Sequence, residues 1–149
     1  MQLSYQINLD AVAFPGQLVD IGVDDIKSAI ATEAIPYGVA VALVAGSDYP
    51  SLRCALPAAA TDTILGIAVA DQNRSQDPSV VAPTYPAMSA VGAICKGRVY
   101  VTVLADVTAG DSVFAEVGTG AIGATGIEIV GAKFLSTAAA GEFAVVELK

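Results

Sequence analysis

The side chains that most often carry out chemistry in proteins are scarce in this sequence, which contains no histidine and no tryptophan. Without an imidazole, neither a Ser-His-Asp nor a Cys-His nucleophile can be assembled, and no metal can be bound through histidine. Cys54 and Cys95 lie in the apolar contexts LRCAL and GAICK, and their separation fits no metal or redox motif. We expect both to be free thiols within the fold, because buried thiols pack as small apolar groups and a reducing cytoplasm disfavours disulfides.

Carboxylates are the acid–base groups that remain, and a pair of them could in principle hydrolyse a glycosidic bond. Most of the acids, however, lie in turns, where aspartate is favoured for local hydrogen bonding to the backbone and stays solvated. The turn acids are Asp48, Asp62, Asp71, Asp77, Asp106 and Asp111. We therefore expect no catalytic pair and no enzymatic activity.

Residues 118–123 spell Gly-Thr-Gly-Ala-Ile-Gly, which matches the G-x-G-x-x-G pattern of dinucleotide-binding loops. That fingerprint requires a helix directly after the glycines, with the pyrophosphate at its N-terminus. Here Gly126 and the β-branched run at 127–130 follow, which disfavours a helix. The pattern predicts a glycine-rich hairpin and no nucleotide site.

Oxygen-bearing residues at alternate positions resemble the first half of a calcium-binding loop. They are Asp71, Asn73, Ser75 and Asp77. Such a loop also needs glycine at its sixth position and glutamate at its twelfth, where this chain has Gln76 and Ala82. Arg74 inside the loop would oppose a cation, so a solvated loop is the better prediction.

Lys96 precedes Gly97 at an expected turn, which is where a lipoyl or biotin carrier domain presents its modified lysine. The neighbours Ile94, Cys95 and Arg98 do not match the carrier pattern. We expect no cofactor.

The composition of the 149 residues points to a surface that is covered by partners. Hydrophobic residues make up 54% and charged residues only 15%, against about 25% charged in an average soluble domain. The longest uncharged stretch, residues 78–95, contains three prolines, so no membrane-spanning helix is expected. The start MQLSYQINLD has neither a basic region nor an apolar region of a signal peptide, so none is expected. A net charge of −8 argues against binding to nucleic acid.

The clearest strand signal lies near the N-terminus. One side of the expected strand is apolar, and its side chains are Leu3, Tyr5, Ile7 and Leu9. The opposite side is polar and carries no charge before Asp10. This alternation is typical of a half-buried strand, and a terminal strand is easily exchanged with a neighbouring chain. We therefore predict that residues 1–14 pair with another chain or lie at a subunit boundary.

Most of the remaining chain alternates between short apolar runs and turns rich in glycine and proline. Strands are expected at 39–44, 51–56, 64–70, 90–96, 98–104, 112–117, 127–136 and 142–148. The run at 64–70 is apolar on both faces and should be central, while residues 24–32 could form the one short helix. This spacing predicts an all-β fold: a sandwich or barrel of short antiparallel strands in a single domain, residues 1–149.

The polar segment at 71–86, DQNRSQDPSVVAPTYP, is long for a connection between strands. Loops of more than about 12 residues in compact domains are usually functional or disordered. We predict that it is an interaction loop, with Arg74, Pro78 and Tyr85 at the interface. Phe14 and the apolar side of the N-terminal strand complete the predicted interface.

Taken in order, the motifs resemble those of the cement, or decoration, proteins of tailed phages. The matching pieces are Phe-Pro-Gly-Gln-Leu at 14–18 with Asp20, Ile-Pro-Tyr-Gly at 35–38, residues 64–69, 96–101 and 107–114, and the ending at 140–148. The resemblance covers nearly the whole chain. It implies a β-sandwich or jelly-roll subunit on the capsid exterior, made in the host bacterial cytoplasm. Its partners would be the major capsid protein and its own copies, as a dimer or trimer.

Two other classes of function stay open at this point. The chain could be another self-assembling β-subunit, such as a tail, baseplate or surface-layer component. It could also be a small ligand-binding or enzymatic β-domain. Addition to preformed capsids, as opposed to polymerisation alone, would separate the first class from a cement protein.

Overall fold

The computed structural model describes residues 15–19, 24–70 and 84–149, and in these residues it contains eleven strands and no helix. The predicted all-β fold is confirmed. The strands are β1 (Asp25–Ala31), β2 (Ile35–Pro36), β3 (Ala40–Leu43), β4 (Arg53–Ala55), β5 (Ile64–Ala68), β6 (Thr84–Tyr85), β7 (Ala90–Thr102), β8 (Ser112–Ala115), β9 (Ile122–Gly123), β10 (Ile127–Phe134) and β11 (Phe143–Leu148).

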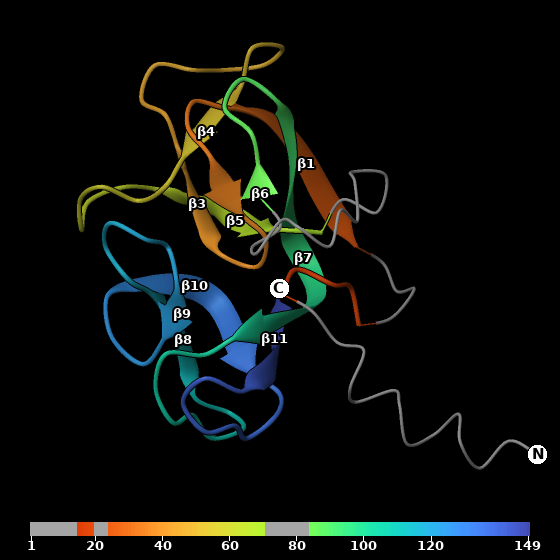
Figure 1. Ribbon diagram of the computed structural model, residues 1–149, viewed down its shortest axis with the longest axis vertical. Coiled ribbons are helices and arrows are strands. Elements are labelled where there is room, and N and C mark those ends of the chain that lie inside the picture. Colours follow the sequence, from red (N-terminus) through yellow and green to blue (C-terminus); the bar gives the residue numbers. More distant parts are fainter. Residues whose placement is uncertain (1–14, 20–23, 71–83) are drawn as a thin grey trace, which may run out of the picture.

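Five strands close into a first ring, called here the N-terminal ring. Its order is β1–β4–β3–β5–β7, and β7 pairs back onto β1, so the sheet closes on itself. The β1–β4 pair is parallel, and the other pairs in the ring are antiparallel. The short pair β2–β6 lies beside this ring (Figure 1).

The second part of β7 belongs to another group of strands, the C-terminal ring. From β7 the order runs β11–β10–β8–β9. A single bridge between Val103 and Ile122 brings β9 back to the end of β7, and the amide of Leu104 donates a 2.9 Å hydrogen bond to the carbonyl of Ile122. The molecule is therefore two barrel-like groups of strands that share β7 (Figure 1).

Two local expectations were wrong. The segment at 24–32 is not a helix but strand β1, because it pairs with β7 on one side and β4 on the other, and these pairings outweigh its weak helical pattern. The expected strands on either side of Gly97 are one strand, β7. Gly97 has φ +129°, and a Cβ there would collide with the Asp24 carboxylate. The glycine lets β7 pass between the rings without reversing direction.

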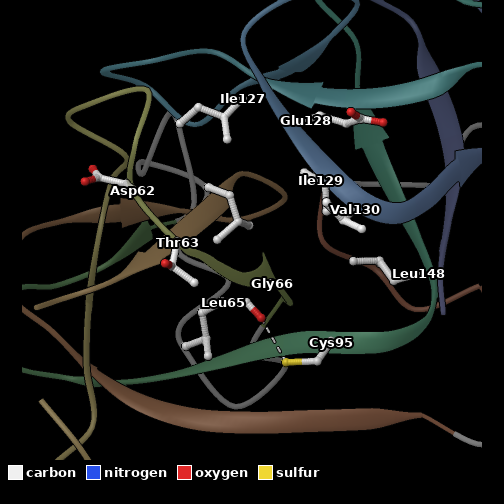
Figure 2. Close-up of a pocket in the computed structure, with 11 residues that line it drawn as sticks. Asp62, Thr63, Leu65, Gly66, Cys95, Ile127, Glu128, Ile129, Val130 and Leu148 are labelled. Atoms are coloured by element: carbon white, nitrogen blue, oxygen red, sulfur yellow. Dashed lines mark hydrogen bonds between the residues drawn. The ribbon is translucent and has the colours of Figure 1, made fainter.

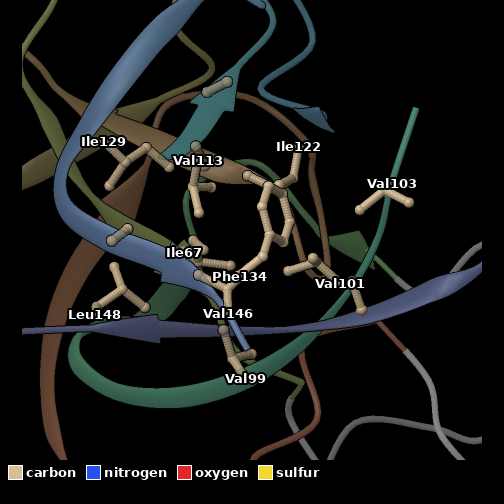
Figure 3. Packing of buried hydrophobic residues seen from close by; sticks show 14 of the residues in the cluster. Ile67, Val99, Val101, Val103, Val113, Ile122, Ile129, Phe134, Val146 and Leu148 are labelled. Atoms are coloured by element: carbon tan, nitrogen blue, oxygen red, sulfur yellow. The ribbon is translucent and has the colours of Figure 1, made fainter. Parts of the chain in front are cut away.

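The buried side chains form two clusters. The larger fills the C-terminal ring, where Phe134 is the largest fully buried side chain and is surrounded by valine and isoleucine (Figure 3). The smaller fills the N-terminal ring. Ile67 belongs to the larger cluster and its neighbour Ala68 to the smaller, so both faces of β5 are buried. The prediction that this strand is central is confirmed.

Residues 15–19 tie the two rings together. The amide of Gly16 donates to the carbonyl of Tyr100 in β7, and its carbonyl accepts from the amide of Ala70 just after β5, both at 2.8 Å. Gly16 has φ +82°, and a Cβ would lie 2.8 Å from backbone atoms of Ala68 and Ala70. Only glycine fits this close approach without displacing the backbone.

Candidate interaction surfaces

The two thiols are free and are not activated. Cys54 is fully buried in β4, and burial raises the pKa of its thiol to about 11. Burial also raises the pKa of Cys95, against a smaller lowering effect of Lys27, and its Sγ donates a 3.0 Å hydrogen bond to the carbonyl of Leu65. Because the thiolate is the reactive form, both residues are poor nucleophiles.

Most of the turn acids that the structure describes accept hydrogen bonds from backbone amides. Asp62 accepts from the amides of Ala58 and Ala59, Asp106 from that of Ala140, and Asp111 from that of Thr108, at 2.7–3.0 Å. Each carboxylate satisfies amides that a turn leaves unpaired. In the described residues no group of three or more acidic, cysteine or histidine side chains could hold a metal ion.

The glycine-rich segment at 118–123 is a turn that leads into β9, and no helix follows it. It joins the rings: the amide of Gly118 donates to the carbonyl of Pro57 at 2.6 Å, and the carbonyl of Gly120 accepts from the amide of Ala40 at 2.8 Å. Thr119 donates its hydroxyl hydrogen to the carboxylate of Glu116 at 2.5 Å. The turn is structural.

One open sheet surface is the outer side of β7, β11, β10 and β8 in the C-terminal ring, called here the outer face. Alternate residues of these strands point into the core, so the others point outward. The outer face includes Arg98, Tyr100, Thr102, Ser112, Phe114, Glu128, Lys133, Leu135, Phe143, Val145 and Glu147.

One row across the outer face is charged. Cross-strand pairing aligns Arg98, Glu147, Lys133 and Ser112 on four neighbouring strands. Glu147 accepts from Arg98 Nε at 3.0 Å and lies 3.7 Å from the Nζ of Lys149, while Lys133 Nζ donates to Ser112 Oγ at 3.0 Å. Two of the six basic residues in the described part of the chain thus lie within 4 Å of the Glu147 carboxylate, and a third, Lys133, is its cross-strand neighbour.

Most of the rest of the outer face is apolar. Phe143 is 41% exposed and Leu135 is 44% exposed. Half-buried Val145 and Tyr100 lie opposite each other on β11 and β7. Sequence reasoning missed this surface. The signal was present in β11, whose sequence Phe-Ala-Val-Val-Glu-Leu is apolar on both faces although it folds with one face toward solvent.

A groove of about 360 Å³ separates the start of β5 from the start of β10 (Figure 2). Cys95 and Leu148 line it together with residues 62–66 and 127–130, and Val130 on its rim is 89% exposed. The carboxylate of Asp62 is already bonded to backbone amides.

Of the predicted interface residues, the structure describes Tyr85. Its side chain is 2% exposed, packs edge-on against Tyr37 with ring centroids 4.9 Å apart, and donates its hydroxyl hydrogen to the carbonyl of Val69 at 2.5 Å. It gives a partner almost no surface of its own. The other predicted residues lie outside the described ranges: Leu3, Tyr5, Ile7, Leu9, Phe14, Arg74 and Pro78.

The structure nevertheless brings together the residues next to the two predicted interface segments. Gly16 and Ala70 are hydrogen-bonded to each other, and they lie close to the points where residues 1–14 and 71–83 join the described fold. The sequence contains no signal for this proximity, because it arises from pairing between residues 54 positions apart.

Comparison with known proteins identifies the family of the chain. A family model described as structural cement protein (E217 gp24/Pam3 gp6) matches residues 1–149. The chain belongs to this family of phage cement proteins. It is a structural protein associated with the phage capsid, as the order of its motifs predicted.

Two solved structures have a similar fold. A chain from the capsid of Myoviridae phage XM1 superposes with a TM-score of 0.72 at 19% sequence identity, covering 91% of this chain and 89% of that one. The head fiber gp8.5 N base of bacteriophage phi29 has a TM-score of 0.55 at 13% identity, covering 85% and 95%. No curated protein matches the chain in sequence. In the described residues no helix is long and apolar enough to cross a membrane.

Proposed function

We propose that this protein binds the outer surface of the capsid and stabilises contacts between major capsid protein subunits. The observation that carries the proposal is the outer face, a preformed sheet surface on which apolar side chains such as Phe143 and Leu135 stay exposed in a member of a cement family. Exposed apolar patches of this kind mark sites of protein association. We also propose that the whole chain acts as one domain, since β7 and residues 15–19 join both rings.

The stabilisation follows from mass action. A ligand that binds only the assembled shell lowers the free energy of that state and not of the separated subunits. Many copies act together, so a modest affinity per copy adds up over the particle. No chemical step is required, which agrees with thiols whose pKa is raised and turn acids that are bonded to amides.

The predicted interface segments belong to the same proposal. Residues 1–14, with Leu3, Tyr5, Ile7, Leu9 and Phe14, would extend to a neighbouring chain. Residues 71–83, with Arg74 and Pro78, would contact the shell. The Gly16–Ala70 hydrogen bond supports this, because it holds the starting points of both segments on one side of the fold. Neighbouring copies on the particle would then form the dimers or trimers expected from the family resemblance.

The experiment is to add purified protein to capsids that lack it. We expect saturable binding to intact shells, a higher melting temperature of the decorated particle and density on its outside in a cryo-electron microscopy map. Polymerisation of the protein alone, without addition to shells, would favour another self-assembling subunit. Density confined to the inside of the shell would contradict the proposal.

A further inference from the structure

We propose that the outer face is the surface that docks on the shell, and that the shell surface opposite it is acidic beside the charged row and apolar beside Phe143 and Leu135. This inference rests on the proposed function and adds the orientation of the subunit and the chemistry of its partner. The partner is the major capsid protein.

Charge is the first argument. The chain has a net charge of −8, so it repels an acidic surface over most of its own surface. Around Glu147 the balance is reversed, because Arg98 and Lys149 pair with its carboxylate and Lys133 lies opposite it on the neighbouring strand. Arg98 and Lys149 have side chains that are 46% and 76% exposed. A partner with carboxylates is attracted to this side of the molecule and repelled elsewhere, which orients the encounter.

The rigidity of the charged row is the second argument. The row runs across four hydrogen-bonded strands, and the hydrogen bonds of Arg98 and Lys133 restrain their side chains before any partner arrives. Restrained side chains lose less conformational entropy on binding. The row is thus ordered in the free subunit.

The adjoining apolar rows supply the third argument. Phe143 and Leu135 are more than 40% exposed. Val145 and Tyr100 lie between Phe143 and the charged row, and Leu135 lies beside Val145. Burying them against apolar side chains of the shell removes their surface from water, while the charges stay at the edge. A second copy docked by the same face around a twofold axis would bring two clusters of excess positive charge together, which disfavours that occupant.

The test compares binding to undecorated capsids for paired variants. The double variant Lys133→Glu with Lys149→Glu reverses two charges next to Glu147. The control is Arg53→Glu, which reverses the charge of an exposed arginine on β4 of the N-terminal ring. We expect the double variant to bind about tenfold more weakly at about 0.05 M salt, with the difference shrinking at about 0.5 M. The Arg53 variant, whose changed charge lies outside the outer face, should bind about as well as the wild type.

A second pair tests the apolar rows. Leu135→Ser should weaken binding to a similar extent at both salt concentrations, whereas Val117→Ser, at a position that is 42% exposed in the turn before β9, should not. Thermal unfolding of each free variant establishes that it is folded. Phe143→Ser repeats the test if the Leu135 variant unfolds.

The outcomes separate this inference from the proposed function. If the wild type binds shells and both outer-face variants bind equally well, the docking surface lies elsewhere and the cement function stands. If the outer-face variants change self-association in sedimentation and leave shell binding unchanged, a second copy occupies the face and the inference is wrong. If the wild type itself does not bind shells, the proposed function fails.

Discussion

The two rings of strands share β7 but are built differently. The N-terminal ring closes through the parallel β1–β4 pair and holds the smaller core, with small side chains such as Ala31, Cys54 and Ala93 around Tyr37 and Tyr85. The C-terminal ring closes through one bridge, and its core consists largely of valine and isoleucine around Phe134. One strand can belong to two rings because a glycine lets it bend where one ring ends and the other begins.

Their surfaces differ as well. Next to the N-terminal ring lie Ala70 and β6, at the start and near the end of the segment 71–86 that is predicted to be an interaction loop. The C-terminal ring has the outer face, with its charged row and exposed apolar side chains. Within our proposal, the outer face of the C-terminal ring docks as a preformed sheet. The N-terminal ring instead positions chain segments that contact the shell and neighbouring copies.

The largest effect on stability should come from the C-terminal core. Phe134→Ala removes the largest fully buried side chain and should destabilise the free protein by about 3–5 kcal/mol. Ile67 and Ile94, from strands of the N-terminal ring, belong to the same cluster, so both rings should unfold in one transition. Urea unfolding followed by circular dichroism and by tyrosine fluorescence measures this. Two separate transitions would show that the rings unfold independently. Val130→Ala, at an exposed site, is the control for a substitution outside the core.

Alkaline pH should act through the N-terminal core. The thiol of Cys54 titrates near 9.0 in the unfolded chain and near 11 when buried, so the unfolded state loses its proton first. Stability should therefore be unaffected by this group below pH 9 and fall by about 2–3 kcal/mol as the pH rises to 11. Urea unfolding at several pH values, with Cys54→Ala as the reference, isolates this contribution. The same slope in both proteins would rule out a role of Cys54.

Gly16→Ala tests the tie between the rings. Its Cβ would lie 2.8 Å from backbone atoms, and we expect a loss of about 2 kcal/mol. Gly46→Ala is the matched control, since Gly46 also has a positive φ but nothing lies within 4 Å of its Cβ, and it should cost about 1 kcal/mol. Thermal unfolding compares the two. Equal losses would mean that the close approach at Gly16 contributes nothing beyond backbone strain.

Removal of residues 1–10 should have the smallest effect on the free subunit. If the segment pairs with another chain, its deletion changes the stability of the monomer by less than about 1 kcal/mol but lowers occupancy on capsids or abolishes oligomers. Calorimetry of the free protein and particle occupancy by gel densitometry give the two values. Unfolding of the truncated subunit would instead place the segment in its own core.

The strands with the strongest local patterns were predictable from the sequence. The apolar run that became β5, the turn before β8 and the two closing strands β10 and β11 lie where the alternation and the glycines placed them. Their signals are local, because side chains alternate every two residues and turns need particular residue types. The family resemblance, based on the order of these pieces, led to the cement family that the family model confirms.

The sequence by itself also excluded histidine-dependent chemistry within this chain, since residue types can be read without a structure and the sequence contains no histidine. Only the tertiary structure decided that residues 25–31 are a strand, that Gly97 bends one strand instead of joining two, and that Gly16 lies against Ala70. It alone aligned Arg98, Glu147 and Lys133 in one row. The physical reason is that these features depend on hydrogen bonds between residues far apart in the chain, and local propensity cannot encode such pairing.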